Sequence, residues 1–106
     1  MPKFMFQASL SPEGVKGLLS EGGTARRSVV KDAIETLGGT LEAFYFAFGG
    51  DDVVGICDLP DNETAAAFGL ETSSSGRVSV TTTVLITPEE VDRAREKNSG
   101  WRPPGA

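Results

Sequence analysis

The fold is decided by Leu41-Glu-Ala-Phe-Tyr-Phe-Ala-Phe48, Gly49-Gly-Asp-Asp52 and Val53-Val-Gly-Ile-Cys-Asp-Leu59, which follow one another directly. Two apolar, β-prone runs flank a Gly/Asp turn, and this pattern predicts a β-hairpin. In the first run, strict alternation places one apolar set on one face, Leu41, Ala43, Tyr45 and Ala47, and a second set on the other, Phe44, Phe46 and Phe48. Because both faces of this strand are apolar, both must be covered.

The chain before the hairpin predicts one strand and two helices. Lys3 to Ser9 is a strand with apolar residues on both faces. Ser11 is a good N-cap for a first short helix, with Pro12 at the first helical position. Thr24 is predicted to cap a second helix, which ends at Gly38-Gly39, where one glycine adopts a left-handed conformation.

The chain after the hairpin predicts a helix, a strand and a last helix. Asp61 or Asn62 caps the helix, and the β-branched run from Val78 to Ile86 is the strand. Thr87-Pro-Glu-Glu90 is a capping box for the last helix. From Asn98 the tail is too rich in Pro and Gly for regular structure.

The resulting order, β-α-β-β-α-β plus a C-terminal helix, predicts an α+β ferredoxin-like domain over residues 1–97 and a tail over residues 98–106. Right-handed crossovers put both main helices on one face of an antiparallel sheet. The other face then carries uncovered apolar side chains, which are rare on monomers. We therefore expect a homo-oligomer, at least a dimer packed sheet against sheet as a dimeric α/β barrel.

Composition limits the possible partners and chemistry. The 106 residues carry a net charge of −5, which argues against a nucleic-acid or anionic-membrane surface. The sequence has no apolar run of membrane-spanning length and no signal pattern. Its one cysteine, Cys57, permits no internal disulfide and predicts a reducing, cytoplasmic setting. The chain has no histidine, and we expect no cofactor and no metal.

Several stretches together carry a family resemblance: Phe6-Gln-Ala-Ser9, Gly22-Gly-Thr-Ala-Arg-Arg27, Gly38-Gly-Thr-Leu-Glu-Ala-Phe-Tyr45, the stretch from Phe48 through Asp58-Leu-Pro-Asp61, Val84-Leu-Ile-Thr-Pro-Glu-Glu90 and Arg102-Pro-Pro-Gly105. With these residues the chain resembles the GYD domain family, small bacterial proteins of the dimeric α/β-barrel type. The resemblance covers nearly the whole chain and implies a fold without implying an activity. The chain departs from the Gly-Tyr-Asp motif, because Asp51 stands where the family generally has Tyr. If that tyrosine serves a ligand, the role is lost or altered here; if it only packs at the turn, nothing functional follows.

Arg26 and Arg27 are the first candidates for ligand binding. They follow two glycines at the start of a helix, where free N–H groups and the helix dipole favour an anion such as a carboxylate or phosphate. The alternative is a surface pair bridging to Glu21, Asp32 or the hairpin aspartates.

Glu42 and Tyr45 in the first hairpin strand are the other candidate ligand-binding residues. Glu42, like Asp58, lies within an apolar strand and is either an acid–base group or a carboxylate facing solvent or paired with an Arg. Tyr45 lies between small neighbours and either lines a pocket or is a core aromatic. Trp101 is predicted to anchor the tail on its own subunit or on the partner.

Three functions remain open at this stage. The first is a small-molecule-binding or regulatory module whose ligand is a small anionic or apolar molecule. The second is a cofactor-independent enzyme, monooxygenase- or isomerase-like, and the third is a structural assembly protein without a ligand. The space between sheet and helices separates them, because the structural alternative expects that space to be packed solid by Phe44, Phe46 and Phe68.

Overall fold

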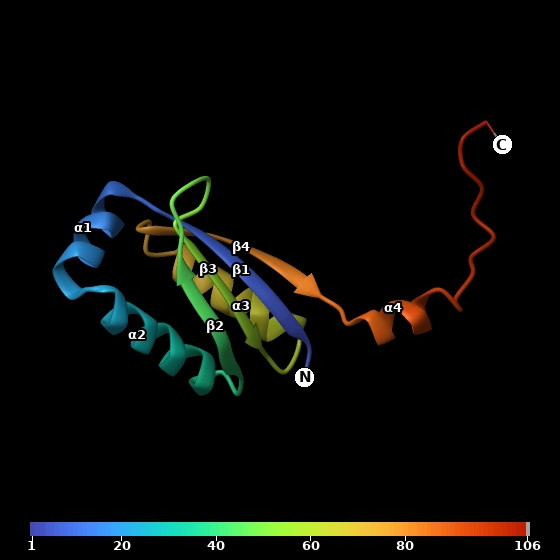
Figure 1. Cartoon of the computed structure of the whole chain (residues 1–106), viewed down its shortest axis with the longest axis horizontal. Helices are drawn as coiled ribbons and strands as arrows, with labels where there is room; N and C mark the ends of the chain where they lie inside the picture. The colour runs from blue at the N-terminus through green and yellow to red at the C-terminus, as the bar shows by residue number, and fades with distance from the viewer. Residues whose placement is uncertain (106) are drawn as a thin grey trace.

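The computed structural model describes residues 1–105 (Figure 1). Its elements follow the predicted order, including the two helices before the hairpin. They are β1 (Lys3–Leu10), α1 (Pro12–Glu21), α2 (Gly23–Thr36), β2 (Thr40–Phe46), β3 (Val53–Asp58), α3 (Asn62–Ser73), β4 (Val78–Leu85) and α4 (Pro88–Ala94).

The four strands form one antiparallel sheet in the order β2-β3-β1-β4. β1 lies between β3 and β4, and in this register Phe6 pairs with Gly55 on one side and with Thr82 on the other. The predicted ferredoxin-like α+β fold is confirmed.

One face of the sheet is covered by α2 and α3, and the core lies between them (Figure 1). Ile34 of α2 and Phe68 of α3 are buried against side chains from the two central strands. The buried apolar residues are Phe4, Phe6, Ala8, Ile34, Val53, Cys57, Leu59, Ala65 and Phe68. Both main helices lie on one face, as the right-handed crossovers require.

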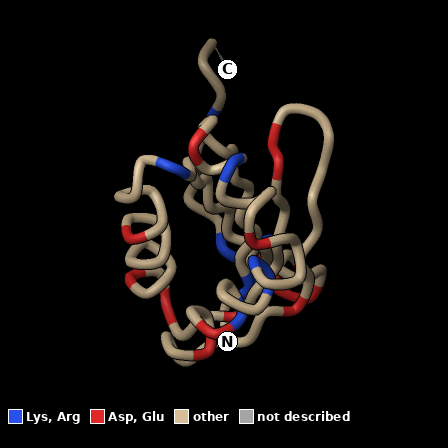
Figure 2. The backbone as a smooth tube through the Cα atoms, turned by 90° about the vertical axis from the view of Figure 1, so that its left-hand side faces the viewer, with Lys and Arg blue, Asp and Glu red and all other residues tan. Residues whose placement is uncertain are grey.

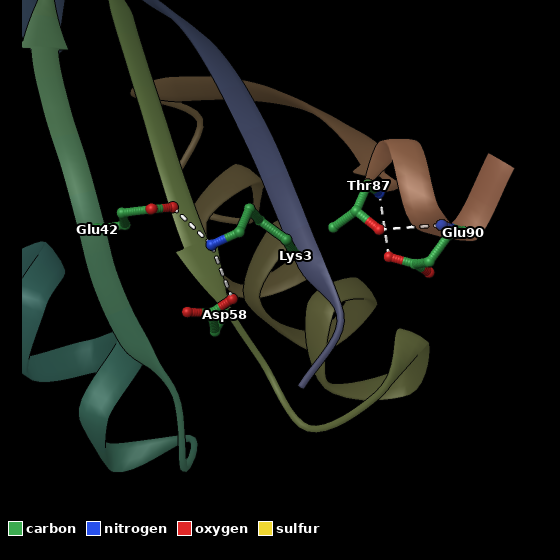
Figure 3. Close-up of polar contacts among 5 residues, drawn as sticks. All are labelled: Lys3, Glu42, Asp58, Thr87 and Glu90. Atoms are coloured by element: carbon green, nitrogen blue, oxygen red, sulfur yellow. Dashed lines mark hydrogen bonds and ion pairs between the residues drawn. The ribbon is translucent and has the colours of Figure 1, made fainter. Parts of the chain in front are cut away.

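Three of the predicted helix starts are confirmed. The Ser11 hydroxyl accepts a hydrogen bond from the Gly14 N–H at 3.1 Å, and the Asp61 carboxylate accepts one from the Thr64 N–H at 2.8 Å. Thr87 begins α4 with the full reciprocal capping box (Figure 3). These caps are set by contacts within four residues, so a local sequence pattern is enough to find them.

The prediction that Thr24 caps the second helix is wrong. α2 begins two residues earlier than this cap predicts, at Gly23, and Gly22 is its N-cap with φ 88° and no side-chain hydrogen bond. A positive φ favours glycine, and it lets α1 end and α2 begin without a connecting loop. Gly38, also with φ 88°, ends the second helix as predicted.

A β-bulge corrects the predicted faces of β2. Leu41 pairs with Cys57 and Ala43 pairs with Ile56, so Glu42 is an extra residue on this strand. Leu41 therefore packs on the core together with Phe44, whereas strict alternation had placed it with Ala43 and Tyr45.

The hairpin loop is longer than the predicted turn. β2 ends at Phe46, and residues 47–52 form the loop, so Phe48 is fully exposed instead of continuing the Phe44 face. Two aspartates fix the loop to the end of β1. The Asp52 carboxylate accepts a hydrogen bond from the Leu10 N–H at 2.8 Å, and the Asp51 carboxylate accepts one from the Ser9 hydroxyl at 3.1 Å.

Beyond β4 the chain forms an extended arm, residues 86–105, that contains α4. Every residue of this arm is exposed, and the arm projects away from the sheet and helices (Figure 1). It gives the molecule extents of 56 × 33 × 22 Å and a radius of gyration of 16.9 Å. A compact chain of this length would have a radius of gyration of about 13 Å.

Within residues 1–105, no helix lies over the second face of the sheet (Figure 1). This open face carries the side chains that alternate with the core set, including Met5, Val54 and Ile56. Basic positions are scattered among acidic ones along the chain (Figure 2). In residues 1–105, no helix is long and apolar enough to cross a membrane.

Candidate functional site

A cavity of about 190 Å³ lies between the helix-covered face of the sheet and the helices α1, α2 and α3. Its lining comes from all four strands and from these three helices, so the tertiary fold, and no single motif, creates it. The lining is Phe6, Ala8, Leu10, Gly14, Gly17, Leu18, Glu21, Arg26, Val30, Phe44, Phe46, Val53, Thr72, Arg77, Val78 and Val80.

The α1 side of the cavity is built from residues spaced three or four apart, Gly14, Gly17, Leu18 and Glu21, which therefore share one helix face. The two glycines differ in their surroundings. A Cβ at Gly14 would lie 2.3 Å from the backbone oxygen of Arg77, so this position needs glycine for packing. A Cβ at Gly17 would have no atom within 4 Å, so packing does not require glycine there.

The opposite side of the cavity is aromatic. The rings of Phe44 and Phe46 meet edge to face with centroids 5.4 Å apart, and Phe44 lies 6.4 Å from Phe6. Phe46 also lies beneath Gly23, where a Cβ would approach its ring to 3.1 Å. The bulge in β2 brings Leu41 onto the same side as these phenylalanines, and the sheet floor is apolar throughout.

The charged groups of the lining are Glu21, Arg26 and Arg77. The Arg26 guanidinium donates two hydrogen bonds to the Glu21 carboxylate, Nε to Oε1 at 2.5 Å and Nη2 to Oε2 at 3.2 Å. Both side chains are about one-third exposed, so this pair lies at the wet end of the cavity. In residues 1–105 the Arg77 guanidinium makes no hydrogen bond or ion pair.

The four predicted ligand-binding residues do not lie together. Arg26 lines the cavity, whereas Arg27 is exposed and outside the lining. Tyr45 and Glu42 extend from β2 on the open face of the sheet, opposite the cavity. Tyr45 is 70% exposed in the single chain and belongs neither to the protomer core nor to this cavity. Arg26 bridges to Glu21, which is one of the partners considered in the surface-pair alternative.

Glu42 and Asp58 share one partner, Lys3, on the open face (Figure 3). The Lys3 ammonium lies 2.6 Å from the Glu42 carboxylate and 3.1 Å from that of Asp58. The hydrogen bond to Glu42, followed by that to Asp58, raises the pKa of Lys3 above 10.5. The two carboxylates are thus partly exposed and share a lysine partner, whereas the alternatives were an acid–base role, exposure to solvent or pairing with an Arg.

The remaining candidate groups stay apart from the cavity. Cys57 is buried, and desolvation, aided by the negative charge of Asp58, raises the pKa of its thiol to about 11. Within residues 1–105 there is no group of three or more His, Cys, Asp or Glu side chains placed to hold a metal ion.

The sequence placed a possible ligand space between sheet and helices but missed most of the residues that line it, because no catalytic or binding motif marks them. The one local signal is Gly14 and Gly17, two glycines at helical spacing inside a helix, where glycine is unfavourable. Glu21 at the end of α1 and Arg77 before β4 lie far apart in sequence, so only the folded chain shows that they line the same cavity.

The sequence profile of the GYD domain family matches residues 4–94. The chain belongs to the GYD domain family. The crystal structure of MtbAldR has a similar fold, with a TM-score of 0.59 and 21% sequence identity over 81% of this chain. The chain spans about half of MtbAldR, 53% of its length. No curated protein sequence matches the chain.

Asp51, which the resemblance places at the motif's Tyr position, has a structural contact. Its carboxylate accepts the Ser9 hydroxyl hydrogen bond and helps to fix the hairpin loop to β1. The loop lies at the end of β1, and neither Asp51 nor Asp52 lines the cavity.

Proposed function

We propose that this GYD domain is a dimeric small-molecule-binding module, acting as a carrier or regulatory partner in the cytoplasm. The main support for a binding function is the glycine at position 17, which lines the cavity. Glycine inside a helix is less favourable than alanine by about 1 kcal/mol, and no neighbouring atom requires it here. Gly17 therefore lowers the stability of α1 while leaving the cavity open.

The cavity also separates binding from the alternatives. In a structural assembly protein without a ligand, the space between sheet and helices should be filled by side chains. Here a cavity of about 190 Å³ lies beside Phe44 and Phe46. For catalysis, the hydroxyl of Thr72 in the lining is already engaged, since it donates to the Phe68 and Gly69 carbonyls at 2.8 and 3.1 Å. The Glu21 carboxylate is likewise held by Arg26. A lining of this kind favours binding over turnover.

Two exposed apolar surfaces support the dimer. The open face of the sheet exposes Tyr45, which pairs with the half-buried Val54, and the arm exposes Ile86, Val91 and Trp101. α4 has a full capping box but only seven residues. Isolated helices shorter than about 12 residues are marginal in water, so α4 needs contacts that a second copy would supply. Cys57, the one thiol, is buried and free, in keeping with a reducing compartment.

The binding function is tested with a small neutral probe, toluene, in NMR titrations of the full chain. We expect saturable shifts of amide signals around the cavity. Gly17→Leu should abolish these shifts because its side chain fills the cavity, while the matched variant Gly17→Ala, which adds one methyl group, retains binding. Both variants should unfold at the same temperature as the parent chain or above it. If neither toluene nor its carboxylate analogue phenylacetate produces a saturable shift in the parent chain, or if Gly17→Leu binds toluene unchanged, the binding function is refuted.

The dimer is tested by native mass spectrometry and sedimentation. Tyr45→Glu puts a charge on the open face and should shift the parent dimer toward monomer. Leu19→Glu is the matched control, since Leu19 is exposed on α1, away from the open face, and it should leave the dimer intact. A parent chain that is monomeric at all concentrations tested would refute this part of the proposal.

A further inference from the structure

The size of the cavity limits its ligand. Pockets for drug-sized ligands have volumes of about 300–1,000 Å³, whereas an engineered apolar cavity of about 150 Å³ takes benzene. At about 190 Å³, this cavity accommodates one six-membered ring with a short substituent, or a branched chain of similar size. The rings of Phe6, Phe44 and Phe46 offer faces and edges to such a group.

The charged residues of the lining indicate which polar group the ligand carries. Glu21 and Arg26 pair through two hydrogen bonds, whereas the exposed Arg77 is the lining cation that has no side-chain hydrogen bond or ion pair within residues 1–105. A guanidinium recognises a carboxylate with two parallel hydrogen bonds. The cavity interior is apolar, and a ligand with a single anionic end would leave that end at the wet rim.

We propose that the cavity takes a one-ring or comparably small branched carboxylate, with its apolar part against the phenylalanines and its carboxylate at Arg77. This inference rests on the proposed binding function and adds the ligand class to it. Arg77 also has a structural role, because its backbone carbonyl accepts the Ser11 N–H at 2.9 Å. A side-chain substitution leaves that backbone contact in place, so the guanidinium can be tested separately.

The test compares phenylacetate with toluene, which share a ring and differ in the carboxylate. Dissociation constants are measured by NMR titration at low and high salt for the parent chain, Arg77→Gln and Arg27→Gln. Arg27→Gln is the matched control, because it also removes one positive charge, next to Arg26, but at a residue outside the cavity lining. We expect the parent chain to prefer phenylacetate about tenfold, as a charged hydrogen bond at a partly exposed rim would give. Arg77→Gln should remove this preference, Arg27→Gln should keep it, and salt should weaken it.

The outcomes distinguish the two proposals. If neither probe binds the parent chain, the binding function itself fails. If toluene binds as well as phenylacetate, or if Arg77→Gln keeps the preference, the cavity binds small molecules but the carboxylate assignment is wrong. Equal losses in Arg77→Gln and Arg27→Gln would show a general charge effect and would also overturn the assignment. Amide spectra of each variant without ligand confirm that it is folded.

Discussion

Gly55 in the middle of β3 is the position where one added methyl group should disturb the core most. Phe6 pairs with it across the sheet, and the Phe6 ring lies over the glycine. A Cβ at Gly55 would come within 2.1 Å of the ring Cζ and within 2.6 Å of both Cε atoms. Gly55→Ala must therefore push the ring aside. Phe6 would then lose its edge contact with Phe68, whose centroid lies 5.6 Å away, and would loosen its contact with Phe44.

The expected loss of stability is about 3 kcal/mol, because overpacking a core costs about 1–3 kcal/mol and each aromatic pair contributes about 0.5–1.5 kcal/mol. This corresponds to a fall in Tm of about 12–24 °C for a domain of this size. Urea unfolding at one fixed protein concentration measures it, since a dimer's stability depends on concentration. In a Phe6→Leu background, Gly55→Ala should cost at least about 1 kcal/mol less, because the obstructing ring is gone.

Gly69→Ala is the control for the general effect of adding a methyl group. Its Cβ would meet only the Thr82 hydroxyl at 3.7 Å, an ordinary contact, so we expect α3 to gain stability. The packing argument is refuted if Gly55→Ala is neutral, or if its cost is the same with Phe6 and with Leu at position 6.

The remaining predictions concern titration. Hydrogen bonds from the side chain and N–H of Thr64 lower the pKa of Asp61 below 3.8. The stabilising effect of Asp61 is therefore present above that value and is lost as pH falls through the lower pKa of the folded state. Urea unfolding from pH 5 to pH 2 should show a loss of stability in acid that Asp61→Asn lacks. For Lys3 the pH dependence has the opposite sign, because hydrogen bonds to Glu42 and then Asp58 raise its pKa above 10.5. Its contribution to stability is complete below 10.5 and is lost as pH rises through the pKa of the folded state. Lys3→Met should therefore flatten the alkaline limb of the plot of stability against pH. With a thiol pKa of about 11 and a buried side chain, Cys57 should react with a chromogenic disulfide reagent at pH 8 far more slowly in the folded chain than in urea, and equal rates would contradict this.

The sequence was sufficient for features controlled by near neighbours. Ser11, Asp61 and Thr87 each cap a helix through a residue three positions ahead, so the spacing alone predicts the contact. Gly38 ends α2 with a positive φ for an equally local reason. The order of strands and helices then followed from hydrophobic periodicity and from the handedness of crossovers.

Features that depend on distant segments could not be predicted in this way. The bulge at Glu42 becomes visible only in the pairing of β2 with β3, and without it alternation assigns Leu41 to the wrong face. Thr24 has the right chemistry for an N-cap, but the junction at Gly22 begins the helix earlier. Gly14 and Gly17 look equivalent in the sequence, and only the approach of the Arg77 carbonyl shows that one glycine is needed for packing and the other is not.

The two proposed interaction sites lie on opposite faces of β2, and this arrangement makes coupling between them testable. Phe44 and Phe46 face the cavity, while Ala43 and Tyr45, between and beside them, face the proposed dimer contact. A shift of this edge strand that opens the cavity for a ligand would move the residues on its other face as well. Coupling between two binding equilibria is reciprocal, so if phenylacetate changes the dimer dissociation constant, dimerisation must change ligand affinity by the same factor. Ligand titrations at protein concentrations below and above the dimer midpoint measure that factor, and Tyr45→Glu should remove the concentration dependence without emptying the cavity.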